Sequence, residues 1–197
     1  MPVADFDSDL CGGGAIPCIR QKGTTNRLDA IPEVIMWPLQ YRKLADREVL
    51  VGTLSSNVST SDRAGLYWFE LQRNTGGWSA RQSAAFAPGT SLNRWMGSIG
   101  IDKRGNIAVG YSASANTAFP SIMVTGRLKN DPLGTLRQEI VQRHSPAAQL
   151  ESNRWGDYGA MTVDPVNNCT FWFTTEFVSA DNLWRTQIAT YRFPGCS

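Results

Sequence analysis

The chain has 197 residues, of which 42% are hydrophobic, and its 19 basic and 17 acidic residues give a net charge of +2. Because these charges are balanced and spread along the chain, the composition excludes the basic footprint of a nucleic-acid-binding protein and a polybasic membrane patch. No apolar run approaches the roughly 20 residues of a membrane span. We therefore expect one sizeable hydrophobic core.

Residues 1–27 are predicted to form an irregular arm, because they show no sustained hydrophobic period. The start of the arm is acidic and lacks the apolar segment of a signal peptide. The alternating aspartates of Asp5–Asp9 resemble a calcium loop, but Leu10 and Ile16 stand where such a loop has its glycine and its bidentate glutamate. We expect a solvated acidic arm and no bound metal or other cofactor.

The rest of the chain repeats itself. Trp37, Trp95 and Trp155 are spaced 58 and 60 residues apart, and each opens a similar series of apolar runs and polar turns. The segment Arg47–Gly52 also matches Gly105–Gly110 without a gap, 58 positions later. Alternating and apolar runs predict eleven strands, which are Pro38–Lys43, Glu48–Leu54, Gly65–Leu71, Ser79–Phe86, Gly97–Asp102, Asn106–Ser112, Ser121–Leu128, Leu136–Gln142, Tyr158–Asp164, Thr170–Phe177 and Arg185–Phe193.

This repetition predicts an all-β, β-propeller-like fold of three four-stranded blades, which is half of a six-bladed ring. The blades span about residues 28–90, 91–150 and 151–197. An open half-ring would leave two apolar blade faces uncovered. We expect it to be completed either by a second copy, as a homodimer, or by sequence outside this chain.

The four cysteines are predicted to form two disulfides. None lies in a C-x-x-C pair and His144 is the single histidine, so a zinc site has too few clustered ligands. Cys11 and Cys18 flank a flexible glycine-rich stretch, while Cys169 begins a strand and Cys196 ends the last unit. Two disulfides would imply an oxidising compartment; the alternative is four free, buried thiols in a cytosolic protein.

Several tracts resemble the C-terminal half of secreted bacterial sialidase-like β-propeller proteins, a group mostly of unknown function. The tracts are Asn93–Ile99, Gly105–Ser112, Asn153–Tyr158, Cys169–Trp172 and Phe193–Cys196, within a resemblance that runs from about Cys18 to the end. The resemblance implies an extracellular or cell-surface β-propeller and supports a Cys169–Cys196 bridge. The nearest match to the sialidase Asp-box, Ser61–Trp68, has a different spacing. A half-propeller also supplies only part of the arginine cluster, Tyr/Glu pair and acidic Asp of an active sialidase.

The predicted site lies where the third unit departs from the repeat. Two extra residues, Asp157 and Tyr158, precede its first strand. In a propeller this loop and the loop that follows Thr170–Phe177 lie on the same face, so we expect their side chains to form one edge, or rim, of that face. Arginine beside tryptophan, as in Arg94-Trp95 and Arg154-Trp155, either packs blades together or contacts a ligand. The predicted ligand-binding residues are Arg154, Trp155, Asp157, Tyr158, Asp181, Trp184 and Arg185.

Two carboxylates at this rim, Asp157 and Glu176, with Tyr158 assisting, are the catalytic candidates for acid/base work on a glycoside. The structural alternative is that Asp157 caps backbone N–H groups and that Glu176 pairs with Arg185 or Arg154. Nothing in the sequence places a nucleophile beside His144. Asn57–Ser59 and Asn168–Thr170 match the glycosylation acceptor pattern.

Three functions follow as hypotheses. The leading one is a non-catalytic extracellular module that binds a surface ligand, a glycan or a protein, through loops on one face. The second is a sialidase-like glycoside hydrolase that uses Asp157 and Glu176. The third is a structural half-propeller that assembles with a second copy of itself.

Overall fold

The structure is a computed structural model that describes residues 2–12, 17–32, 34–89 and 91–196. In these ranges the chain is all-β, as predicted, so none of this part is a helix that could cross a membrane. Its eleven strands are β1 Gln40–Lys43, β2 Glu48–Asn57, β3 Ala64–Arg73, β4 Ser79–Phe86, β5 Asn93–Ile101, β6 Ile107–Ala115, β7 Ala118–Arg127, β8 Ile140–His144, β9 Ala160–Val163, β10 Thr170–Val178 and β11 Trp184–Arg192.

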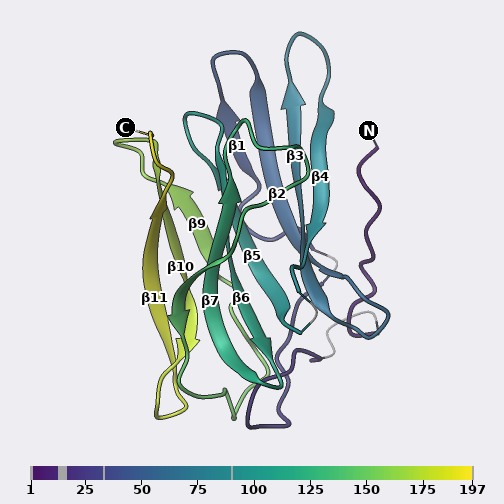
Figure 1. Cartoon of the computed structure of the whole chain (residues 1–197), viewed down its shortest axis with the longest axis vertical. Helices are drawn as coiled ribbons and strands as arrows, with labels where there is room; N and C mark the ends of the chain where they lie inside the picture. Colours follow the sequence, from purple (N-terminus) through teal and green to yellow (C-terminus); the bar gives the residue numbers. More distant parts are fainter. Residues whose placement is uncertain (1, 13–16, 33, 90, 197) are drawn as a thin grey trace.

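The strands form three open antiparallel sheets that lie side by side in chain order (Figure 1). Sheet 1 has the order β1-β2-β3-β4, sheet 2 has the order β5-β6-β7-β8, and sheet 3 has the order β11-β10-β9. The prediction of four strands in every unit is therefore wrong for the described part of the third unit. After β11 the chain turns at Pro194 and Gly195 and is fixed to the start of β10 by a disulfide.

Most strand bounds lie close to the predicted runs, and β4 matches its run at both ends. The predicted Gly97–Asp102 run begins too late, because Asn93–Trp95 already pairs with β6 before the register shifts near Trp95 and Ser98. The predicted Leu136–Gln142 run begins too early, since pairing of β8 with β7 starts at Ile140. The position of a bulge depends on how the strand pairs with its neighbour, and the hydrophobic pattern of the strand itself carries no information about that pairing.

The sheets are joined by two apolar layers. Between sheets 1 and 2, buried side chains of β2 and β3 meet those of β5 and β6, including Val51, Trp68, Ile99 and Tyr111. Between sheets 2 and 3, buried residues of β6 and β7 meet β10 and the chain end, and this layer comprises Ala108, Ile122, Val124, Met161, Phe171, Phe173, Phe177 and Phe193. Each sheet thus packs on the next through side chains that alternate along its strands.

The ungapped match between Arg47–Gly52 and Gly105–Gly110 does not describe equivalent positions. A Cβ at Gly110 would lie 2.5 Å from the Phe173 ring of sheet 3, whereas a Cβ at Gly52 would enter the Phe69 ring on the outer face of sheet 1. The two glycines therefore face opposite ways relative to the next sheet. A slip of one residue produces this reversal because side chains alternate between the two faces of a strand.

The three repeated tryptophans also lie in unlike surroundings. Trp95 and Trp155 are buried together, with ring centroids 6.0 Å apart, in a cluster that includes Leu10, Ile19 and Leu28 of the N-terminal region. Trp37 is 73% exposed. The repeat prediction therefore identifies equivalent positions for Trp95 and Trp155 and is wrong for Trp37.

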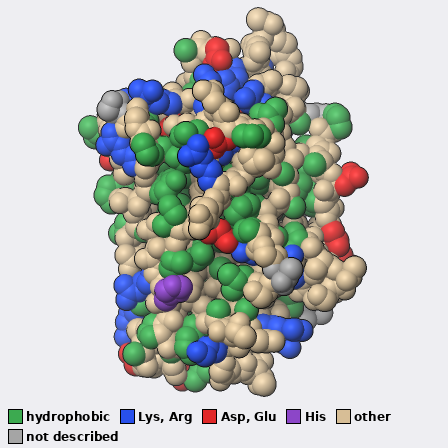
Figure 2. Space-filling view, viewed as in Figure 1, with side chains coloured by type: hydrophobic (Ala, Val, Ile, Leu, Met, Phe, Trp, Pro, Cys, Tyr) green, Lys and Arg blue, Asp and Glu red, His purple; other side chains and the backbone are tan. Residues whose placement is uncertain are grey.

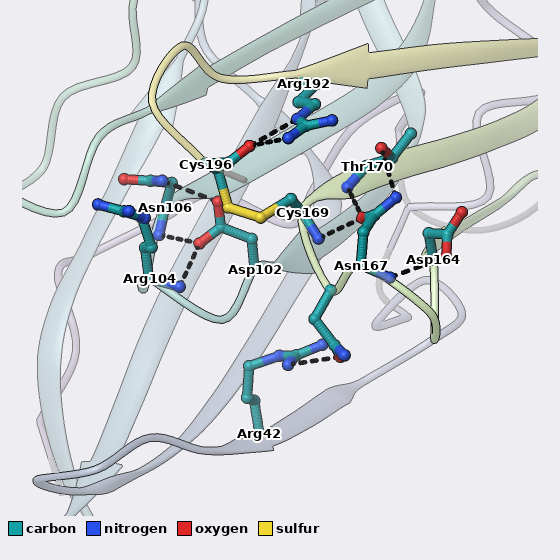
Figure 3. The surroundings of a disulfide bond; sticks show 11 residues. Arg42, Asp102, Arg104, Asn106, Asp164, Asn167, Cys169, Thr170, Arg192 and Cys196 are labelled. Carbon is teal, nitrogen blue, oxygen red and sulfur yellow. Dashed lines mark hydrogen bonds between the residues drawn. A yellow bond between two sulfur atoms is a disulfide. The ribbon is translucent and has the colours of Figure 1, made fainter.

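Both predicted disulfides are present, Cys11–Cys18 and Cys169–Cys196. The second lies among the turns of neighbouring sheets, and the guanidinium of Arg192 donates to the carbonyl of Cys196 at 2.6 Å (Figure 3). Two disulfide bonds fit a protein of an oxidising environment, such as the cell exterior.

Two of these turns are built alike. The Oδ1 atom of Asp102 accepts hydrogen bonds from the backbone N–H groups of Arg104 and Asn106 (Figure 3). The Oδ1 atom of Asp164 accepts those of Val166 and Asn167. Aspartate is favoured at such positions because its side chain replaces a backbone partner in the turn. The same device thus begins β6 in sheet 2 and β10 in sheet 3.

Candidate functional site

Most of the predicted site residues line a single cavity at one end of sheet 3, where the chain enters β9 and where β10 connects to β11. We call it the sheet-3 cavity. Its volume is about 480 Å³. It is lined by Gln149, Ser152, Arg154, Trp155, Gly156, Asp157, Tyr158, Gly159, Thr174, Thr175, Glu176, Trp184 and Thr186.

Six of the predicted site residues line this cavity, and two do not. Asp181 and Arg185 lie outside the lining and form an exposed ion pair with each other at 3.1 Å. Asp181 lies in the β10–β11 turn, and Arg185 lies on β11 between the lining residues Trp184 and Thr186, so its side chain faces the other side of the sheet. Of the stretch that follows β10, the cavity is lined by Trp184 and Thr186 of β11 and not by the turn residues 179–183.

Trp155 forms the floor of the cavity and not a surface for a ligand. Its side chain is 1% exposed, and its ring N–H donates to the hydroxyl of Ser112 in sheet 2 at 2.9 Å. Of the two roles considered for tryptophan at this position, its burial favours packing between sheets.

The two arginines of the repeated Arg-Trp pairs have different surroundings. Arg94 is 2% exposed and makes a bidentate ion pair with Glu139, with both N–O distances at 2.7 Å. Arg154 is 66% exposed along its side chain and pairs with Asp157 across one turn of the entry loop. Only Arg154 lines the cavity. The arginine of the repeated Arg-Trp pair is therefore part of a buried ion pair in sheet 2, whereas before sheet 3 it is exposed.

Two aromatic rings stand free at the cavity. Tyr158 is 93% exposed and Trp184 is 63% exposed, and both line it. Tyr158 projects from the entry loop between Gly156, which has a φ of 62°, and Gly159, whose N–H donates to the Gly156 carbonyl at 2.9 Å. Glycine is suited to this left-handed conformation, so the loop holds Tyr158 outward on a tight turn.

The carboxylates of the cavity are incompletely paired. Asp157 accepts a hydrogen bond from Arg154, but its Oδ1 atom is buried without a partner, and the same is true of Glu176 Oε1 and Thr175 Oγ1. Burial raises the pKa of Glu176, the nearby charge of Asp157 raises it further, and the backbone N–H of Gly156 acts in the opposite direction. Among the described ion pairs, Arg154 and Arg185 are taken by aspartates, so the predicted pairing of Glu176 with either one is wrong.

We expect Glu176→Gln to stabilise the fold at neutral pH. Because the pKa of Glu176 is raised on folding, ionising this carboxyl destabilises the folded state at any pH above that pKa. The destabilisation disappears as the pH falls below the pKa of the unfolded chain, about 4.3. Thermal unfolding should therefore show a higher Tm for the variant at neutral pH and equal values at about pH 4. Glu151→Gln, an exposed carboxylate, is the matched control; a variant less stable than the parent at neutral pH would contradict the prediction.

The other candidate residues have structural partners. The hydroxyl of Ser121 lies 3.0 Å from Nδ1 of His144, while Ser145 accepts the backbone N–H of Val178 at 3.0 Å. Asp7 bonds to Asn57 at the arm, and Asn168 accepts a hydrogen bond from Arg42. Across the described ranges, no group of three or more His, Cys, Asp or Glu side chains is arranged to hold a metal ion.

Sequence reasoning missed the hydroxyl and amide groups of the cavity. Thr174 and Thr186 lie on the same face of sheet 3 as Glu176, because β10 and β11 pair Thr174 with Ile188 and Glu176 with Thr186. The alternation of β10 around Glu176 was a usable signal for Thr174. Gln149 and Ser152 lie in an irregular segment with no such signal.

The face in Figure 2 mixes hydrophobic, basic and acidic side chains, without a continuous stripe of either charge. Comparisons with protein-family models, curated proteins and solved structures found no match for this chain.

Proposed function

We propose that this chain is a non-catalytic, extracellular, propeller-like module that binds a carbohydrate ligand in the sheet-3 cavity. The observation that carries the proposal is the cavity itself, which joins two exposed aromatic rings to carboxylate, hydroxyl and amide groups. Ligand sites in proteins commonly combine an apolar surface with a few polar groups that fix orientation. A sugar ring has an apolar face that can stack on an aromatic ring and hydroxyl groups that can donate to carboxylates. It therefore matches both the aromatic rings and the polar groups of the cavity.

The propeller-like arrangement is supported by the relation between the sheets. Sheets 1 and 2 have the same strand order, each begins with an edge strand and continues outward through hairpins, and sheet 3 follows the same order for its three strands. Each sheet packs face to face on the next one in the chain. Stacking of similar sheets through their faces is the arrangement of propeller blades.

The role that we propose for each residue of the cavity follows from how exposed its side chain is. Tyr158 and Trp184 provide rings that a ligand reaches without displacing protein atoms. Asp157, which is 16% exposed along its side chain, and Glu176 accept hydrogen bonds from ligand hydroxyl groups. Arg154 is the single basic residue of the lining and is paired with Asp157, so the cavity offers no unpaired cation to an anionic sugar.

We expect Trp184→Ala and Tyr158→Ala each to weaken binding by about tenfold or more, because exposed aromatic anchors dominate such contacts. A glycan array first identifies the ligand, and calorimetry then measures its affinity for the parent and the variants. Trp172→Ala is the matched control: Trp172 lies on the same face of sheet 3 at 42% exposure and does not line the cavity.

Equal losses in Trp172→Ala and Trp184→Ala would place the ligand on the open sheet face and contradict the cavity as the site. An empty glycan array, together with an empty pull-down from an extracellular extract, would remove the support for a binding module.

A second candidate function is hydrolysis of a glycoside, and the raised pKa of Glu176 favours it. A carboxyl whose pKa is raised by burial is suited to be a general acid, with Asp157 as the second carboxylate and Tyr158 beside it. Release of an aryl group from a panel of aryl glycosides tests this function, and no release by the parent protein contradicts it.

A further inference from the structure

Strand β11 is an unprotected sheet edge. It pairs with β10 through nine consecutive residues without a register shift, and no strand is paired to its other side among the described residues. Along it Trp184 is 63% exposed and Ile188 is 65% exposed. A long, regular edge with apolar side chains presents a row of backbone donors and acceptors to another strand.

The other edge strands have the features that prevent such pairing. β1 and β9 have four residues each and β8 has five. β4 pairs with β3 through a register shift near Glu70, and β5 is buried along its whole length and carries a bulge. Short strands, bulges and covered edges are the usual protections. β11 has none of these three; it contains no proline, lysine or acidic residue, and its charged residues, Arg185 and Arg192, lie at or next to its two ends.

The sequence of β11 is complementary to itself in the antiparallel direction. When two copies are centred on Ile188, Trp184 lies opposite Arg192 and Arg185 lies opposite Tyr191, in both halves of the pair. Thr186 then faces Thr190, and Ile188 faces its own copy. No arginine stands opposite an arginine, and each stands opposite an aromatic ring that can interact with a cation.

We propose that β11 pairs with β11 of a second copy of this chain, antiparallel and centred on Ile188, so that two three-stranded sheets become one continuous six-stranded sheet. The interface is isologous, because each copy contributes the same strand and the contacts close on themselves. This self-association is a property additional to ligand binding in the sheet-3 cavity, and it does not depend on such binding. Arg192 of the second copy would, however, lie beside Trp184 at the cavity edge.

The mass of the purified protein in solution tests the proposal directly. Light scattering after gel filtration, over a concentration series, should approach twice the chain mass of 21.7 kDa. Ile188→Lys places two like charges opposite each other across the two-fold axis and should weaken self-association by about tenfold or more. Since Ile188 is largely exposed, the variant should keep the parent's circular dichroism.

Ile35→Lys is the matched control, and it separates this interface from a ring closed through the sheet faces. Ile35 is 54% exposed and lines an apolar hollow with Leu54 and Phe69 on the outer side of sheet 1, away from β11. Pairing through β11 leaves it uncovered, so Ile35→Lys should remain dimeric. Closure of a six-bladed ring would cover it, and the lysine would then dissociate the dimer.

Cross-linking tests the register. A residue on the two-fold axis faces its own copy at a Cα separation of about 4.5–5.5 Å, which suits a disulfide. Ile188→Cys should therefore form a covalent dimer without reductant, and Val166→Cys, 91% exposed in the β9–β10 turn, should not. A parent that stays monomeric up to its solubility limit, a dimer that survives Ile188→Lys, or one that dissociates in Ile35→Lys would each overturn the proposal.

Discussion

Replacing Trp155 with alanine should destabilise the fold by about 3–5 kcal/mol, the range for a large aromatic removed from a core. The ring is 1% exposed, packs against Trp95 and donates a hydrogen bond to Ser112 of the neighbouring sheet. Its loss therefore leaves both a void between sheets 2 and 3 and an unpaired hydroxyl.

Denaturant unfolding followed by far-ultraviolet circular dichroism measures this change in the free energy of unfolding. Trp184→Ala is the control, because a ring that is 63% exposed contributes little to the core. A loss below about 1 kcal/mol for Trp155→Ala would show that the cavity floor rearranges readily. It would also undermine the view that Trp155 is a packing residue.

The second large effect is expected for Glu139→Gln, at about 3–5 kcal/mol, because it leaves the buried Arg94 without its carboxylate. Burial alone would raise the pKa of Glu139, but hydrogen bonds from Arg94 and Tyr111 and the charge of Arg94 outweigh it and hold that pKa below its usual value. The ion pair therefore stabilises the fold fully above the pKa of the unfolded chain, about 4.3, and this contribution is lost as the pH falls through the lower folded pKa.

Unfolding measured at neutral pH and in acid should show the parent and Glu139→Gln differing most at neutral pH and converging as the pH drops. Asp181→Asn breaks an ion pair whose side chains are both about half exposed, and it should change the free energy of unfolding by less than about 1 kcal/mol. A pH-independent difference for Glu139→Gln would mean that its shape, and not its charge, matters.

The strands could be predicted because their signal is local. The apolar runs Leu66–Phe69 and Phe171–Phe173 are visible in the local sequence, and both are largely buried within their sheets. Trp37 shows the limit of the repeat: the same residue at the same spacing is exposed, because the cluster that buries Trp95 and Trp155 includes arm residues with no counterpart elsewhere in the chain.

The candidate site was likewise predictable only where the signal was local. An insertion before β9 marked Asp157 and Tyr158, and the structure brings both to one cavity with Glu176. The burial of Trp155 depends on a contact with Ser112, which is distant in sequence. The ion pairs of Asp157 with Arg154 and of Asp181 with Arg185 are local, but they depend on the backbone path of the two loops, which the residue types alone do not specify. The apolar runs of the third unit already number three, as in sheet 3, and the expectation of a fourth strand came from the repeat alone.

The Cys169–Cys196 bridge has a mechanical consequence. It ties the last turn to the first residue before β10, so the β10–β11 hairpin is enclosed in a covalent loop. A force that pulls on the C-terminus is therefore passed to the start of a central strand, which is held on both sides, and does not peel β11 away residue by residue. The hairpin would therefore resist unzipping from that end for as long as the bridge stays oxidised.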